Sequence, residues 1–261
     1  MFRLTQRYLL WLLVGLLTLA IMMGSQSLPQ AVANDPGRVF DPEFSLITYN
    51  PPNRGAPGKT GDAATRGECP GIIALQPSLS NWGETTHTHP TFWIYLSDAA
   101  QSVTLTLSEE YSKEAFYSAS FISAAEAGIG RYTLPYTAPT LALDTPYRWH
   151  MEVNCPTEDD APAPSVDGVV MRRAIPMALQ AELNEAAPRD RIALFSADGL
   201  WYDALDELAE LRLANNIDET LEGDWGNLLQ HVEPLVKLDG GLSATIVEEY
   251  PEIVPEPIVS D

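Results

Sequence analysis

The sequence predicts a mainly β chain with a C-terminal α subdomain: an antiparallel, immunoglobulin-like β-sandwich followed by a short helical hairpin region. Residues 145–155 (TPYRWHMEVNC) alternate apolar and polar side chains without a break, as a half-buried strand does. Turn-rich pieces separate further short apolar segments between residues 67 and 174, which is typical of a sandwich. After Pro176 the apolar spacing changes from two residues to three and four, which favours helices.

Seven strands are expected in the sandwich, and each is followed by a turn-rich stretch. Residues 91–96 (TFWIYL) are apolar on both faces, so this strand is expected in the middle of a packed layer. Residues 77–88 are interpreted as a loop. The expected strands cover residues 72–76, 91–96, 103–107, 115–122, 131–134, 147–155 and 166–173.

Four helices are expected after the sandwich. Pro188 ends the first of them, and Asp190 is expected to cap the second. The middle pair meets at Gly199 and resembles a tetratricopeptide-type helix-turn-helix, but a solenoid needs about three such units. The helices, at residues 176–187, 191–197, 200–213 and 225–232, are therefore expected to pack against the sandwich.

The two cysteines, Cys69 and Cys155, are 86 positions apart. They are too far apart for a redox CxxC pair and too few for a zinc site alone. In an exported protein we expect them to form a disulfide, which would stabilise the fold by about 4 to 5 kcal/mol on the chain-entropy model. The alternative is two separate buried thiols.

The N-terminus has the layout of a secretory signal peptide. Arg3 and Arg7 precede an apolar run at residues 8–24, and Ala31-Val32-Ala33 forms a cleavage site. The alternative is a retained anchor, although the run is just short of the roughly 20 residues that span a bilayer. We expect a periplasmic or secreted protein with no stable membrane span after cleavage. The expected organisation is a signal peptide (1–33), a flexible lead-in (34–66), the sandwich (67–174), the helical subdomain (175–236) and a disordered acidic tail (237–261).

The chain is strongly acidic, with 36 acidic and 15 basic residues and a formal net charge of −21. Such a charge repels phosphate backbones and argues against a nucleic-acid partner. The acids gather after Asp198, and Asp203, Glu207 and Glu210 fall on the polar face of one expected helix. We interpret that face as solvated; a surface for a basic partner or for loosely held divalent cations is the alternative.

One candidate metal site precedes the TFWIYL strand. His87 and His89 are two residues apart, and in extended chain both rings project to one side, with Glu84 and Asp98 as candidate third ligands. The alternative is a pair of solvated loop histidines. No nucleophile, zinc-protease or nucleotide-loop motif is present, so no catalytic residue and no cofactor are assigned.

The aromatic residues provide a second candidate site. Trp82, Trp93, Tyr95 and Tyr147 are candidates for an exposed platform that binds sugar or peptide. The alternative is that these four side chains fill the core and rim of the sandwich.

Several motifs together resemble a known family: RGECP at 66–70, HPTFWIYL at 89–96, YRW at 147–149, the Arg172–Arg173 pair, and GLWYDALDELAELR at 199–212. They are similar to the exported cyanobacterial family catalogued as domain of unknown function 928, over residues 65–234. The resemblance implies a periplasmic or secreted location and no established activity, so it transfers no catalytic residue.

The expected function is therefore an exported, non-catalytic interaction module with an unknown protein or glycan partner. One alternative is a metal-dependent binder or hydrolase centred on His87 and His89. The other alternative is a carbohydrate-binding module that uses the exposed aromatic residues.

Overall fold

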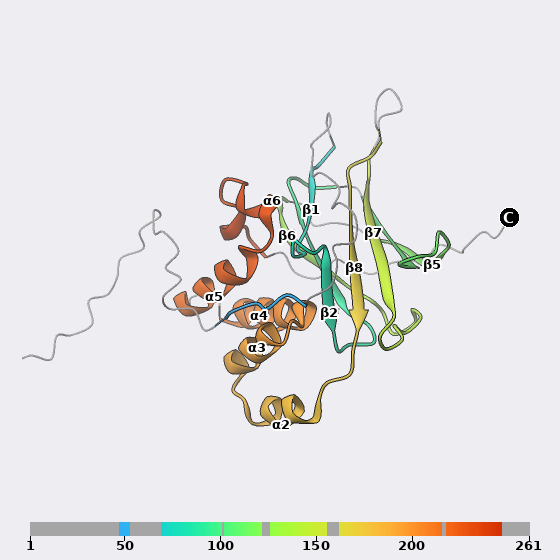
Figure 1. Cartoon of the computed structure of the whole chain (residues 1–261). Helices are drawn as coiled ribbons and strands as arrows, with labels where there is room; N and C mark the ends of the chain where they lie inside the picture. The colour runs from blue at the N-terminus through green and yellow to red at the C-terminus, as the bar shows by residue number, and fades with distance from the viewer. Residues whose placement is uncertain are drawn as a thin grey trace, which may run out of the picture. The chain divides into compact units, whose positions relative to one another are not determined.

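A computed structural model describes residues 47–52, 69–100, 102–121, 126–155, 162–215 and 218–246. The expected signal peptide lies outside these ranges. Within them, eight β-strands precede five α-helices and a short 3-10 helix (Figure 1). None of the helices in the described ranges combines the length and the apolar character needed to cross a bilayer.

The smaller sheet has three antiparallel strands in the order β1-β3-β6. The central strand, β3, is buried along almost its whole length, because it is apolar on both faces and has a neighbour on each side. The sequence prediction for this strand is confirmed. The strands are β1 (Ile72–Ala74), β3 (Thr91–Leu96) and β6 (Gly128–Thr133).

The larger sheet is mixed, with the order β2-β8-β7-β4-β5. Its pairs are antiparallel except β2 with β8, which run parallel, so the prediction of a purely antiparallel arrangement is wrong at this edge. Strand β2 falls within residues 77–88, which were interpreted from sequence as a loop. It was missed because WGET is too short to show alternation. The strands are β2 (Trp82–Thr85), β4 (Ser102–Glu109), β5 (Ala115–Phe121), β7 (Pro146–Asn154) and β8 (Ser165–Arg172).

The two sheets share one hydrophobic core. Strand β7 buries every second side chain, which confirms its predicted alternation. Trp149 of β7 packs against Phe92 of the smaller sheet, with ring centroids 5.6 Å apart. Cys69, before β1, and Cys155, after β7, form a disulfide with their Cα atoms 5.9 Å apart. The bond therefore ties a flank of one sheet to a flank of the other.

The helices lie on the side of the sheets where β1 and β2 run, and β5 lies on the far side from them (Figure 1). The second helix begins at Pro188 and has Ala187 as its N-cap, so the prediction that Asp190 caps it is wrong; proline suits a first helical position. The helices are α2 (Met177–Glu185), α3 (Pro188–Ala197), α4 (Trp201–Ala214), α5 (Glu219–Leu229), α6 (Glu233–Val236) and the 3-10 helix η2 (Gly241–Ser243).

Part of the expected flexible lead-in is ordered. Ile47 and Tyr49 are buried, the Asn50 amide donates to the Ser196 carbonyl at 3.1 Å, and Asn227 donates to the Ile47 carbonyl at 3.3 Å. For residues 47–52 the expectation of a flexible lead-in is therefore wrong. The sequence did not identify the surface that buries these two side chains, because helices distant in sequence provide it.

The first part of the expected disordered tail is ordered too. Residues 241–243 form η2, and Ile246 bridges to Ile129 at the edge of β6. For these residues the expectation of disorder is wrong. The rest of the acidic tail lies outside the described residues.

Candidate functional site

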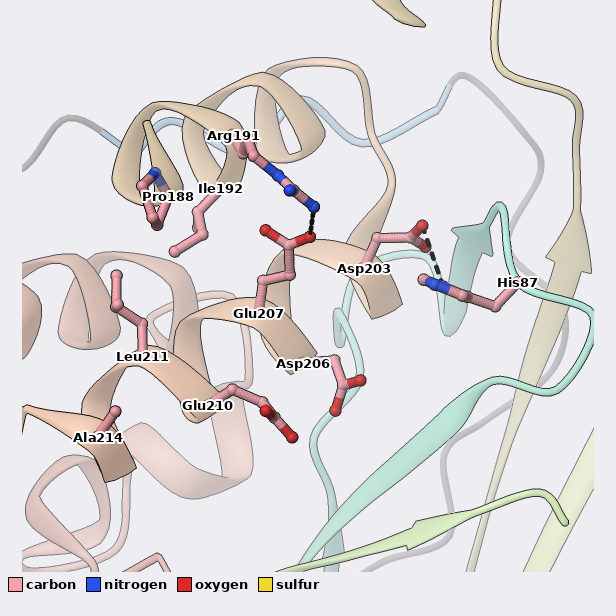
Figure 2. A pocket seen from close by; sticks show the side chains of 10 residues that line it. All are labelled: His87, Pro188, Arg191, Ile192, Asp203, Asp206, Glu207, Glu210, Leu211 and Ala214. Atoms are coloured by element: carbon pink, nitrogen blue, oxygen red, sulfur yellow. Dashed lines mark hydrogen bonds and ion pairs between the residues drawn. The ribbon is translucent and has the colours of Figure 1, made fainter. Parts of the chain in front are cut away.

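A cavity of about 450 Å³ opens between α3 and α4, beside the loop that follows β2. Its four carboxylates lie on one side together with His87 and Arg191, and its apolar residues lie on the other side (Figure 2). We refer to these sides as the acidic half and the apolar half. We call this cavity the α3–α4 groove. It is lined by His87, Pro188, Arg191, Ile192, Asp203, Asp206, Glu207, Glu210, Leu211 and Ala214.

Helix α4 contributes all four of the carboxylates in the lining. Positions 203, 206, 207 and 210 follow the three- and four-residue spacing that brings side chains to one side of a helix. Figure 2 shows Glu207 pointing toward Arg191 of α3 and Asp203 pointing toward His87. The face interpreted from sequence as solvated is therefore in contact with other elements, and Asp203 is buried.

Asp203 fastens the first turn of α4 to the loop after β2. Its fully buried carboxylate accepts hydrogen bonds from the Thr86 amide, at 3.1 and 3.2 Å, and from the Thr86 hydroxyl. The Nδ1 atom of His87 lies 3.3 Å from the same carboxylate. This hydrogen bond to Asp203 raises the pKa of His87 above its ordinary value.

Asp206 fastens the next turn of α4 to the smaller sheet. Its carboxylate accepts from Trp93 Nε1 at 3.2 Å and from Thr91 Oγ1 at 3.1 Å, and Arg131 lies 3.8 Å away. Burial raises the pKa of Asp206 even though these donors and the arginine oppose the shift. These three partners lie on strands β3 and β6.

Glu210 is the most accessible carboxylate of the groove, with a side chain that is 58% exposed, and Glu207, at 29%, is as exposed as Asp206. Glu207 and Glu210 form ion pairs with Arg191 and Arg131 respectively. Burial nevertheless raises the pKa of Glu207. This half of the groove therefore holds partly desolvated negative charge that a cation would stabilise.

The position of the groove is set by the aromatic residues that begin α4. Tyr202 donates its hydroxyl to Gln76 Oε1 at 2.6 Å and accepts from Trp149 Nε1 at 2.7 Å. Trp201 donates to the Leu75 carbonyl at 2.9 Å. A Cβ at Gly83 of β2 would lie 2.6 Å from the Tyr202 ring, so glycine is required for this close approach.

In the structure, the two candidate metal-binding histidines contact different partners. His89 hydrogen bonds through Nε2 to the Ala138 carbonyl and through Nδ1 to the Thr88 hydroxyl, both at 3.1 Å. His87 instead faces Asp203 of α4. The alternation of an HxH pair did not indicate this divergence, because Ala138 and Asp203 are distant in sequence.

The two candidate third ligands are engaged elsewhere. Glu84 pairs with Arg173 Nε at 2.7 Å, and Asp98 accepts from the Ala99 amide at 2.7 Å. Within the described ranges, His, Cys, Asp and Glu side chains form no group of three or more that could hold a metal ion. The structure therefore does not assemble the ligand set considered from sequence.

The candidate aromatic platform is not exposed; its four side chains fill the core and rim, which is the alternative considered from sequence. Trp82, Trp93 and Tyr147 are at most 7% exposed, and Tyr95 is half-buried. Trp93 is held by Asp206, while Tyr147 packs against Phe116 with ring centroids 5.4 Å apart. Neither contact is local in sequence.

Comparison with known proteins adds a family match. A family model described as Domain of Unknown Function (DUF928) matches residues 55–238. No curated protein matches the chain. Among solved structures, the CARDB domain of the PF1109 protein from Pyrococcus furiosus, in complex with di-metal ions, matches at 10% identity with a TM-score of 0.22, covering 42% of this chain and 100% of that one. At that TM-score nothing about fold or ligand transfers.

Proposed function

Because the chain belongs to the DUF928 family, whose description names no activity, we propose a function from the α3–α4 groove. The protein is an exported, non-catalytic interaction module that binds a basic segment of a partner protein. The observation that carries this proposal is the division of one groove into an acidic half and an apolar half.

The acidic half carries more negative charge than its own cations neutralise. Four carboxylates, those of Asp203, Asp206, Glu207 and Glu210, line it, and two arginines, Arg191 and Arg131, pair with them, which leaves two negative charges before His87 is counted. A lysine or arginine head group entering between Glu207 and Glu210 would stabilise the ionised form of both.

The apolar half suits the stem of the same side chain. Ile192, Leu211 and Ala214 line this end of the groove. Lysine and arginine bury their methylene stems along apolar surface while the charged head group stays with polar partners. The ligand class that matches both halves is therefore a long cationic side chain in an otherwise unspecified peptide.

The hydrogen bonds of Asp203 and Asp206 support binding rather than catalysis. A general acid or base must be able to exchange a proton with substrate. Asp203 and Asp206 instead accept hydrogen bonds from Thr86, Thr91 and Trp93, which join α4 to the sheets. We assign these two carboxylates a positioning role.

Export and a finer fold assignment are part of the proposal. The Cys69–Cys155 disulfide fits an oxidising compartment outside the cytosol, and the N-terminal apolar run fits a cleaved signal peptide. We also assign the two sheets to an immunoglobulin-like sandwich, with the parallel β2–β8 pair as a departure from that type.

Calorimetric titration with a hexalysine peptide tests the proposal, with hexaglutamate and a neutral peptide as comparison ligands. We expect hexalysine alone to bind, and the double variant Glu207→Gln with Glu210→Gln to weaken binding at least about tenfold, because glutamine keeps the shape and removes the charge. Glu182→Gln, on the exposed face of α2, is the matched control. Absence of hexalysine binding, or equal loss in the control, would contradict the proposal.

A further inference from the structure

Four strands end the two sheets, and three of them are protected. Strand β2 lies under α4, where Gly83 meets Tyr202. Strand β6 receives the C-terminal segment, because the Ile129 amide donates to the Thr245 carbonyl at 2.9 Å. Strand β1 is only three residues long. Covering and shortness are the usual ways in which proteins block edge-to-edge pairing.

Strand β5 differs from these edges. It is seven residues long, and within the described ranges β4 is its one neighbour in the sheet. The sequence has no charged residue and no proline from Ala115 to Ala125, although charged residues make up 20% of the chain. The register shift in β4 at Leu107/Ser108 affects only the start of β5, so residues 117–121 pair regularly with β4. An edge of this kind is a template for another strand.

We propose that β5 pairs antiparallel with β5 of a second copy of this chain. A two-fold axis through Ser118 places Tyr117 of each copy opposite Ala119 of the other, within the regularly paired part of the strand. On each side of the axis a large side chain therefore faces a small one. This self-complementarity selects a second copy as the occupant of the edge.

Charge supports the same choice of surface. Two molecules that each carry a formal charge of −21 repel one another over most orientations. The uncharged β5 edge is a surface on which they can approach, and added salt strengthens the contact because it screens the remaining repulsion. This interface is separate from the α3–α4 groove, so either proposal can fail without the other.

Charge placed at Ser118 tests the pairing. Ser118 lies on the outer face of the larger sheet, opposite Thr106 of β4, and on the axis of the proposed dimer. Ser165, at the start of β8, lies on the same outer face opposite Glu152, three strands away from β5. Ser165→Lys and Ser165→Glu are therefore matched controls for Ser118→Lys and Ser118→Glu.

The measurement is sedimentation equilibrium on the chain expressed with its own N-terminal segment and purified without reductant. We expect a monomer–dimer equilibrium that salt strengthens. Ser118→Lys and Ser118→Glu each weaken the dimer at least about tenfold, because identical charges meet at the axis, and an equimolar mixture of the two restores it. The Ser165 variants dimerise like the wild type, and all variants keep the wild-type circular dichroism.

Several results would overturn the pairing. One is a wild-type chain that stays monomeric up to about 0.2 mM in salt, which would put the Kd above that concentration, weaker than about 5 kcal/mol of association. A dimer that survives both Ser118 variants, a mixture that fails to restore it, or an equal loss in the Ser165 variants would each place the contact elsewhere. A monomer that binds unrelated extended peptides along β5 would assign the edge to other chains.

Discussion

The side of the sheets that packs against α4 and the edge at β5 differ in the polar interactions that they make. Under α4, the buried side chains of Tyr202 and Asp203 have hydrogen-bond partners that are up to 126 residues away in sequence. At β5 the chain carries no charge, and the sheet ends. The acids near α4 join elements within one molecule, whereas we propose that the β5 edge offers its backbone to another chain.

The largest effect on stability is expected at Asp203. Asp203→Ala removes the charged acceptor of the Thr86 amide and hydroxyl, and should lower the free energy of unfolding by about 3 kcal/mol. Urea unfolding measures the change. Glu182→Ala, on an exposed position of α2, should stay within about 0.5 kcal/mol of wild type. Equal stability of the two variants would contradict the role of Asp203 in holding α4 against the loop after β2.

A smaller loss is expected at Tyr202. Tyr202→Phe removes a buried hydroxyl that bonds both Trp149 and Gln76, and should cost about 2 kcal/mol because both partners stay buried. Tyr136→Phe is the control, since Tyr136 is 93% exposed and its hydroxyl meets solvent. Thermal unfolding of both variants compares them; a Tyr202→Phe protein as stable as the control would contradict the buried network.

The His87–Asp203 contact should make stability depend on pH. The pKa of His87 is raised in the folded state by its hydrogen bond to Asp203, so its contribution is fully present below the unfolded value of about 6.5 and is lost as pH rises through the folded pKa. The side chain is 59% exposed, so we expect about 0.5 kcal/mol or less.

The measurement is the free energy of unfolding of wild type and His87→Gln across this pH range. Burial raises the pKa values of Asp206 and Glu207 in both proteins, and the charge of His87 lowers the pKa of Glu207, so the coupling of His87 to Glu207 is part of the measured difference. His150→Gln, on the outer face of β7, is the control. A difference that stays constant or grows above neutral pH would contradict the sign.

The smallest effect on stability is expected at strand β5. Ser118→Lys should change the free energy of unfolding of the monomer by less than about 0.5 kcal/mol, because the side chain faces solvent at a sheet edge. Dilute urea unfolding, below the dimer concentration range, measures it. A loss as large as that of Asp203→Ala would mean that β5 is as tightly constrained as α4.

Much of the β architecture follows from local pattern. The alternation from Tyr147 to Val153 predicted β7, and the two-sided apolar run predicted β3. Strand β2 was not predictable, because WGET has no alternation and its partner, β8, comes about 80 residues later. The burial of Ile47 and Tyr49 was not predictable either, since it depends on helices that are far along the chain.

The candidate site was predictable only in part. His87 stood out from the sequence, but as one half of a metal pair rather than as a partner of Asp203, which lies 116 positions later. The three- and four-residue spacing of acids on α4 is the same for a solvated face as for a buried one. What separates Asp203 from Glu210 is the position of Thr86 and of the strands, and that is a tertiary property.

Amide hydrogen exchange at Thr86 tests the central claim most directly, because that amide donates to both oxygens of Asp203 from a loop. We predict protection at Thr86 close to that of the amides of neighbouring β8 in the wild type, and its loss in Asp203→Ala. Exchange at Thr86 as fast as in an open loop would contradict the claim that α4 is fastened to the sheets through Asp203.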